Sequence, residues 1–208
     1  MHKTGQNTTA QLQSRKGRAL LAACILYVPM AACATPGTGS QSKQTESVAN
    51  NPGFQEFSHN VDSYEQLRDQ LESPLPPIKP TDDAEAIEAH EHTLATKIVQ
   101  AREGAKAGDI FTEKGSAAFR KVIQTAFSGP KGRDLYKTMF QGEPLNVTLH
   151  INQIYPASLP ATTVPPTLLL LLPKLPQGLE YRIVGRDFAL EDVKARLLID
   201  FIREVFPL

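Results

Sequence analysis

The chain has 208 residues, 41% of them hydrophobic, with 22 basic side chains against 22 acidic ones and no tryptophan. This composition suits one modest globular domain with tails, and it argues against an aromatic-lined platform for sugars or bases. The first 32 residues contain four of the basic side chains and none of the acidic ones, so the rest of the chain carries a net charge of about −4. Such a surface lacks the positive footprint that nucleic acid requires, and we expect no nucleic-acid partner.

Residues 15–34 have the layout of a bacterial export signal. A basic cluster precedes a dozen mostly apolar residues, and small residues follow around Cys33. The apolar run is shorter than the roughly 20 residues of a transmembrane helix. Its last positions, Met30-Ala31-Ala32-Cys33, resemble the lipobox of bacterial lipoproteins, with Met30 where Leu is usual. This resemblance implies cleavage before Cys33, a diacylglyceryl thioether on its sulfur and acylation of the new N-terminus.

Two alternatives to a lipoprotein follow from the same residues. Ala32-Cys33-Ala34 also fits an A-x-A cleavage site, and cleavage after Ala34 would release a soluble periplasmic protein. The other alternative is an uncleaved anchor or no export. Ala34-Thr35 after the cysteine, in place of Asp, resembles lipoproteins that are sent to the outer membrane. We expect the protein in the cell envelope, held by acyl chains at the periplasmic face of a membrane, the outer membrane rather than the inner one.

The rest of the chain divides into a tether and one domain. We predict a signal peptide over residues 1–32, a flexible tether rich in small and polar residues over residues 33–60, and a single α+β domain over residues 61–208. Cys33 and Cys24, which too few apolar residues precede to form a lipobox, are the only cysteines. The domain therefore has no disulfide and no thiol, and packing must stabilise it.

A short helix and a proline-rich spacer are expected at the start of the domain. Asp62 or Ser63 can cap a helix that ends at Glu72. Residues 73–80 contain four prolines and favour a stiff polyproline-like connector. The alternative for this spacer is a PxxP ligand that a partner recognises.

Helical periodicity continues through the middle of the chain. Asp82 and Glu85 form a capping box for a helix that extends to about Ala107, and Thr112 can cap the helix that follows. A glycine-proline pair, Gly129-Pro130, ends that helix and precedes a shorter one. The three expected helices cover about residues 83–107, 113–127 and 133–140.

The spacing of apolar residues changes to two after residue 144. Residues 145–151 alternate strictly between apolar and polar side chains, which predicts a strand with one solvated face. Residues 156–176 then contain six prolines around five consecutive leucines, 168–172. We expect these leucines to form one helical turn or an extended segment that fills the core.

The C-terminal stretch predicts a hairpin and a further strand. Leu179, Tyr181 and Ile183 share one face, Gly185-Arg186 supplies a two-residue turn, and the alternation resumes after it. Glu191-Asp192 mark a second turn, and residues 197–202 form the last strand, although spacing within residues 193–206 also fits a helix. Helices followed by strands predict an α+β fold, with N-terminal helices packed on a small antiparallel sheet made by the C-terminal hairpin or meander.

Four passages together resemble a family of uncharacterised exported bacterial proteins. They are GAKAGDIFT (104–112), VPPTLLLLLPKLP (164–176), LEYRIVGRDFALED (179–192) and LLIDFI (197–202). The resemblance covers about residues 62–202 and implies a single domain behind an export signal, with no activity, substrate or cofactor to carry over. Members usually have a polar residue such as Asn near position 196 and Pro near position 203. This chain has Arg196 and Arg203 there, which favours a helical continuation of its last turn.

His90 and His92, flanked by Glu88 and Glu91, form the cluster that most resembles a metal site. The histidines of an HExxH motif lie four residues apart on one helix face, whereas these lie two apart and point in opposite directions. We interpret His90 as a packing residue at the edge of an apolar stripe and His92 as a surface residue. We predict no metal site and no cofactor.

The sequence contains no recognisable catalytic signature. No GxSxG elbow surrounds a serine, no glycine-rich phosphate cradle is present, and the adjacent acids 191–192 are expected to be solvated rather than paired for glycoside hydrolysis. His150 lies on the solvated face of its expected strand. Arg182, Arg186 and Asp187 could bind an anion, but Asp187 more simply bonds the turn backbone or Arg186. We assign no catalytic residue.

We therefore expect a membrane-anchored periplasmic lipoprotein whose domain is not an enzyme. It would bind an envelope protein or the cell wall through its sheet or a proline-rich segment. One alternative is an exported, hydrolase-like enzyme whose site is assembled from scattered residues such as His150, Arg182 and Asp187. The other is a structural envelope protein that acts through its abundance.

Overall fold

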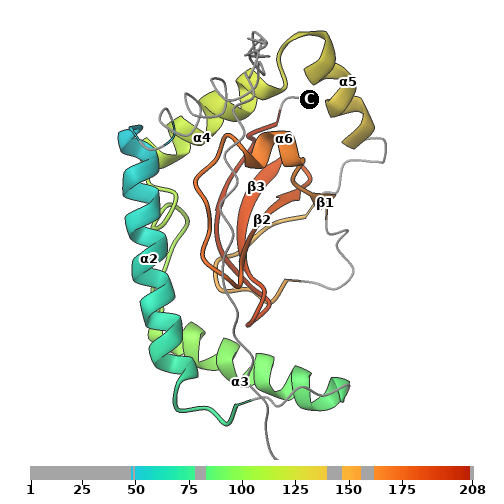
Figure 1. Cartoon of the computed structure of the whole chain (residues 1–208). Coiled ribbons are helices and arrows are strands. Elements are labelled where there is room, and N and C mark those ends of the chain that lie inside the picture. Colours follow the sequence, from blue (N-terminus) through green and yellow to red (C-terminus); the bar gives the residue numbers. More distant parts are fainter. Residues whose placement is uncertain (1–47, 49, 78–82, 140–146, 156–161, 207–208) are drawn as a thin grey trace, which may run out of the picture. The chain divides into compact units, whose positions relative to one another are not determined.

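A computed structural model describes residues 48, 50–77, 83–139, 147–155 and 162–206, all within the unit Pro36–Leu208. The expected signal peptide, Cys24, Cys33 and Asp82 lie outside the described residues. Helices precede a C-terminal antiparallel sheet, so the chain has the predicted α+β fold (Figure 1). The elements are α2 (Pro52–Glu72), α3 (Ala84–Ala101), α4 (Glu113–Ala126), α5 (Gly129–Met139), β1 (Thr162–Thr163), α6 (Pro166–Leu169), β2 (Leu179–Val184), β3 (Asp187–Asp192) and β4 (Leu197–Ile202).

Helix α2 begins ten residues before the expected cap, so the predicted boundary of the tether at residue 60 is wrong. The Asn51 side chain accepts hydrogen bonds from the Gly53 and Phe54 N–H groups, and Pro52 occupies the first turn, where its missing N–H costs nothing. Phe54 and Phe57 are buried in the core. The folded domain therefore begins well before residue 61, because these two rings belong to its core and Val48 packs against it.

The boundaries of the next helices depend on local capping. Asp83 caps α3 with hydrogen bonds to the Glu85 and Ala86 N–H groups, and the helix ends at Ala101 instead of the expected Ala107. The predicted cap of α4 by Thr112 is confirmed. Helix α5 begins at Gly129 rather than near residue 133, because Pro130 is tolerated in the first turn of a helix.

The sheet is a meander in the order β1-β2-β3-β4. The predicted hairpin is confirmed: β2 pairs with β3 from Leu179↔Asp192 to Val184↔Asp187, and Gly185 in the turn has φ +58°. The last strand, β4, is also confirmed, and the helical alternative for residues 193–206 is wrong. Residues 203–204 form a turn, so the helical continuation favoured by Arg203 is wrong as well. The expected turn at residues 191–192 is corrected, since both belong to β3.

The strand expected over residues 145–151 is absent from its described part. Residues 147–150 form no ladder, and the chain turns at Asn152, which has φ +59°. The alternation still marks burial, because Leu149 is buried and His150 is exposed. Only Ile154 then forms an isolated bridge, to Leu197. Burial on alternate positions therefore occurred without the backbone pairing that defines a strand.

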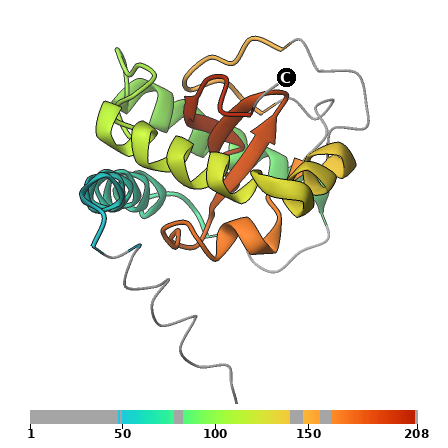
Figure 2. The same cartoon turned by 90° about the horizontal axis from the view of Figure 1, so that it is seen from above.

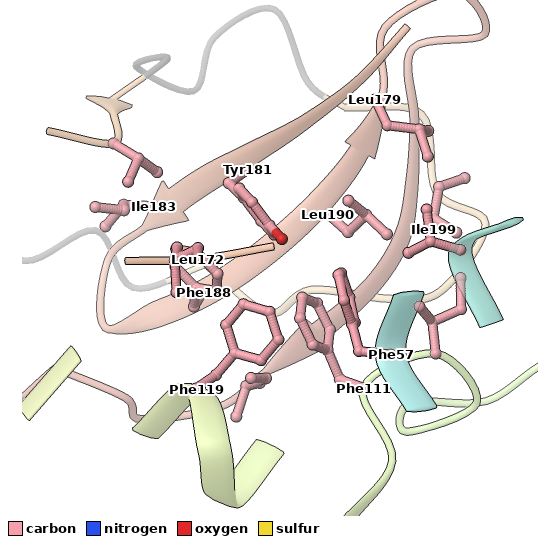
Figure 3. Close-up of a cluster of buried hydrophobic side chains, with 14 of the residues drawn as sticks. Phe57, Phe111, Phe119, Leu172, Leu179, Tyr181, Ile183, Phe188, Leu190 and Ile199 are labelled. Carbon is pink, nitrogen blue, oxygen red and sulfur yellow. The ribbon is translucent and has the colours of Figure 1, made fainter. Parts of the chain in front are cut away.

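One face of the sheet carries the main core. Phe119 of α4 packs its ring 4.8 Å from Phe57 of α2 and 5.8 Å from Tyr181 of β2, measured between centroids (Figure 3). Helices α2 and α4 contact each other (Figure 2). A Cβ on Gly53 would lie 2.5 Å from the Lys114 carbonyl oxygen, so a side chain there would push the two helices apart.

A smaller cluster covers the opposite face of the sheet. Leu149 and Tyr155, from the segment before the sheet, pack there against Val184, Ala189 and Phe201. The sheet is therefore buried on both faces, which explains why β4 (LLIDFI) contains a single polar side chain, Asp200. Among the described residues, no helix is both long enough and apolar enough to cross a membrane.

Candidate functional site

A groove of about 400 Å³ lies along the outer edge of β2. It forms because β1 pairs with only two residues of β2, Ile183 and Arg182. The chain then meets Pro165 and Pro166, which have no N–H to continue a ladder, and turns away as α6. The groove lies between this departing segment and β2. Its lining residues are Thr163, Val164, Leu169, Pro173, Lys174, Leu175, Leu179, Glu180, Tyr181 and Arg182.

The leucine run of residues 168–172 builds one wall of the groove. As expected, it forms a single helical turn, α6, and sends Leu168 and Leu172 into the core. Leu169 and Leu170 point outward and are 44% and 66% exposed. The wall is held to the sheet by the Tyr181 hydroxyl, which donates to the Pro173 carbonyl oxygen at 3.0 Å. Leu169 therefore lines the apolar groove and is partly exposed to solvent, next to the exposed Leu170.

Charged side chains are also among the lining residues of the groove. The guanidinium of Arg182 contacts the Glu180 carboxylate at 2.8 Å and the buried Glu191 carboxylate at 2.5 Å. Burial lowers the pKa of Arg182, but the hydrogen bond and charge of Glu191 and the charge of Glu180 outweigh it, so the pKa is raised. Lys174 is exposed, and among the described residues its ammonium contacts no carboxylate. Lys174 is thus a cation of the groove lining that remains available to a ligand.

The groove has the properties of a binding site for an apolar ligand. Its volume falls in the usual range for small-molecule pockets, and its walls are mostly aliphatic and aromatic with a few polar groups. The hydroxyl of Tyr181 already donates to the chain, and burial raises the pKa of that hydroxyl far above its usual range. The Tyr181 hydroxyl therefore keeps its proton. The polar groups of the groove are suited to holding a ligand in place.

The histidines that we considered for metal binding lie apart, as their spacing predicted. His90 is half-buried beside a second hollow, of about 690 Å³, with Asp69, Glu72 and Lys194, whereas His92 is exposed. The Lys194 ammonium contacts the Glu72 carboxylate at 2.8 Å across this hollow. Among the residues the structure describes, no group of three or more His, Cys, Asp or Glu side chains could hold a metal ion.

The residues named for a hidden enzyme site make separate contacts. The Asp187 carboxylate accepts a hydrogen bond from the Glu204 N–H at 2.8 Å, whereas Arg182 binds Glu180 and Glu191. The His150 side chain is exposed, and within the described part of the chain no hydrogen bond or ion pair links these three residues. Arg186, the other candidate for an anion site, donates to the Phe206 carbonyl oxygen.

The buried acids are the feature that the sequence did not predict. Asp192 is fully buried, accepts a hydrogen bond from the Tyr64 hydroxyl at 2.7 Å and lies 3.7 Å from the Arg68 guanidinium. It also accepts from the N–H groups of Lys194 and Ala195, which closes the turn into β4. Burial raises the pKa of Asp192, and these donors oppose the rise.

Asp200 forms a second buried site. It connects two of the sequence passages that carry the family resemblance, GAKAGDIFT (104–112) and LLIDFI (197–202). A bulge in β4 places one extra residue between the pairs Glu191↔Leu198 and Leu190↔Asp200. The Asp200 carboxylate accepts hydrogen bonds from the N–H groups of Gly108, Ile110 and Phe111 at 2.7–3.0 Å. The signal that could have revealed this role is an acid placed within the otherwise apolar LLIDFI.

The two buried aspartates, Asp192 and Asp200, have structural roles. Asp200 fixes the loop between α3 and α4, and Asp192 ties α2 to the end of β3. Neither lines the groove at β2. The groove is therefore the candidate functional site, and the acids hold the elements around it in place.

Comparison of the chain with protein families, with curated proteins and with solved structures finds no match. The function of this chain must therefore be inferred from its own residues and geometry.

Proposed function

We propose that the protein is a lipid-anchored component of the bacterial cell envelope whose α+β domain is a binding module. The acyl chains on Cys33 hold the protein at the periplasmic face of a membrane. The residues that follow the cysteine favour the outer membrane. The groove at the edge of β2 is the binding site. The resemblance to exported bacterial proteins supports the same location.

The observation that carries the location is the layout of residues 15–34. A basic cluster, an apolar run of signal-peptide length and small residues before Cys33 match the order that export and lipid attachment require. Several acyl chains, at about 0.8 kcal/mol for each buried CH₂, would make attachment essentially permanent.

A pair of cysteine variants tests the anchor. Cys33→Ser should abolish labelling by a fatty-acid analogue in growing cells and release the protein from the membrane fraction. Cys24→Ser is the matched control, because it removes the other cysteine and should leave labelling intact. Unchanged labelling of Cys33→Ser would refute the lipid site at Cys33. If labelling were lost only in Cys24→Ser, the lipid site would be Cys24 instead.

The binding role is supported by the exposed Leu169 in the wall of the groove. A large apolar side chain left in solvent beside an apolar groove is typical of a binding surface. A structural envelope protein that acts through its abundance gains nothing from such a groove. An exported hydrolase would need a site assembled from His150, Arg182 and Asp187. Arg182 instead pairs with Glu191, and Asp187 accepts a hydrogen bond from the Glu204 N–H.

Site-specific crosslinking in intact cells separates these roles. A photoreactive residue at position 169, in the groove wall, should capture a defined envelope component. The same residue at position 99 is the control, because Val99 on α3 is similarly exposed, at 39%, and lies away from the groove. Equal capture from both positions would contradict a binding site at the groove.

A further inference from the structure

We propose that the groove at the edge of β2 binds a single apolar chain that ends in a carboxylate, the chemistry of a fatty acid. This inference rests on the proposed binding role and names the class of ligand. The apolar chain would lie along β2 between Leu169 and Leu179, and the carboxylate would lie against Lys174.

The shape and lining of the groove favour one flexible apolar chain. Val164, Leu175, Leu179 and the Tyr181 ring supply its walls, and the groove is open to solvent where Leu169 is exposed. A chain of methylene groups gains free energy in proportion to the apolar surface it buries and needs no hydrogen-bond partners along its length. A lining of this composition provides that environment.

A peptide strand added to β2 fits the same surface less well. An added strand needs free backbone groups on the edge it joins. Part of this edge is already occupied, because the Leu179 N–H donates to the Pro176 carbonyl oxygen at 3.3 Å and β1 pairs with Arg182 and Ile183. The groove therefore offers apolar contact more than backbone pairing.

The charges of the groove lining favour a ligand group with one negative charge. Arg182 lies between two carboxylates, Glu180 and Glu191, which offset its charge. Lys174 contacts neither acid, so its ammonium can pair with one incoming carboxylate. Among the described lining residues, one free cation matches one negative charge, and a cationic group would be repelled by Lys174.

Calorimetric titration of the full chain carrying Cys33→Ser, which removes the acyl acceptor, tests the proposal. The probes are dodecanoate, dodecanol, dodecyl phosphate and dodecyltrimethylammonium, each below its micellar concentration. We expect dodecanoate to bind with one molecule per chain and more tightly than the other three. Absence of saturable dodecanoate binding, or tighter binding of the ammonium or phosphate probe, would overturn the proposal.

Three further substitutions locate the ligand. Lys174→Met should weaken dodecanoate binding about two- to five-fold, the size of a solvent-exposed ion pair, and leave dodecanol binding unchanged. Leu169→Asp should weaken both probes at least ten-fold. Val99→Asp, the same change at a comparably exposed position on α3, should weaken neither. Equal affinities of Leu169→Asp and Val99→Asp would place the ligand elsewhere and overturn the proposal.

The outcomes also separate this inference from the proposed function. If a leucine-rich peptide binds in a manner that Leu169→Asp abolishes while dodecanoate does not bind, the groove is a peptide site and the fatty-acid proposal fails. The envelope binding role would then still stand. The fatty-acid labelling of Cys33 tests only the anchor, and its outcome does not bear on the class of ligand.

Discussion

Replacing Asp200 by asparagine should destabilise the protein far more than an isosteric change on the surface. Each carboxylate oxygen accepts two N–H groups: Oδ1 from Gly108 and Phe201, and Oδ2 from Ile110 and Phe111, at 2.7–3.0 Å. Asparagine retains one acceptor oxygen and turns an NH₂ group toward the other two donors.

The size of the effect follows from the two donors that lose their acceptor. A buried donor without a partner costs about 1–3 kcal/mol, so the variant should lose about 2–6 kcal/mol of unfolding free energy. A domain of this kind has about 5–15 kcal/mol in total. Even the smaller loss should lower the melting temperature by roughly 4–8 °C.

Urea unfolding followed by circular dichroism measures this loss, and Asp109→Asn is the matched control. Asp109 is exposed and accepts one N–H, from Lys106 at 2.9 Å, in the same loop. Its replacement should change the unfolding free energy by no more than about 0.5 kcal/mol. If Asp200→Asn cost as little as Asp109→Asn, the reasoning about buried acceptors would be refuted.

Two more predictions concern pH and backbone strain. Burial and the Asp192 carboxylate raise the pKa of Tyr64, so the folded state holds this proton more tightly than the unfolded state does. Stability from Tyr64 is complete below about pH 10 and falls above it by up to about 1.4 kcal/mol per pH unit. Tyr64→Phe should show a shallower fall between about pH 10 and 11 in urea unfolding, and an unchanged slope would contradict this. Arg196 has φ +49°, a left-handed conformation that costs a residue such as arginine about 1 kcal/mol. Arg196→Asn should therefore raise the melting temperature, because asparagine tolerates this conformation, whereas Arg196→Ala should give no such gain.

The conformation of Arg196 also shows why no helix continues at this turn, because its φ of +49° lies outside the helical region. A residue such as Asn, which the resemblance led us to expect near position 196, suits φ > 0. The chain keeps the turn with arginine, and the Arg196 carbonyl oxygen accepts the Tyr155 N–H at 2.7 Å. The tertiary contact holds the backbone in place despite its local cost, so no helix continues there.

Predictions from local sequence signals succeeded for elements that depend on residues close together in the sequence. The hairpin over residues 179–192 follows from alternation and a glycine turn, and the cap at Thr112 follows from one side chain and the N–H groups that come after it. The tether boundary failed because Phe54 and Phe57 lie in a polar stretch. The partner that buries both of them, Phe119, is more than 60 residues away in the sequence.

The sequence by itself determined the α+β class, the hairpin with its last strand, and the expectation of export with a lipid on Cys33. These depend on periodicity, caps and short signals that neighbouring residues carry. Only the tertiary structure decided that the acids at 191, 192 and 200 are buried and that a groove opens beside β2. Both results arise when segments far apart in the chain meet: three of the four N–H donors to Asp200 lie about 90 residues upstream, and the groove exists only where residues 163–175 fold back along β2.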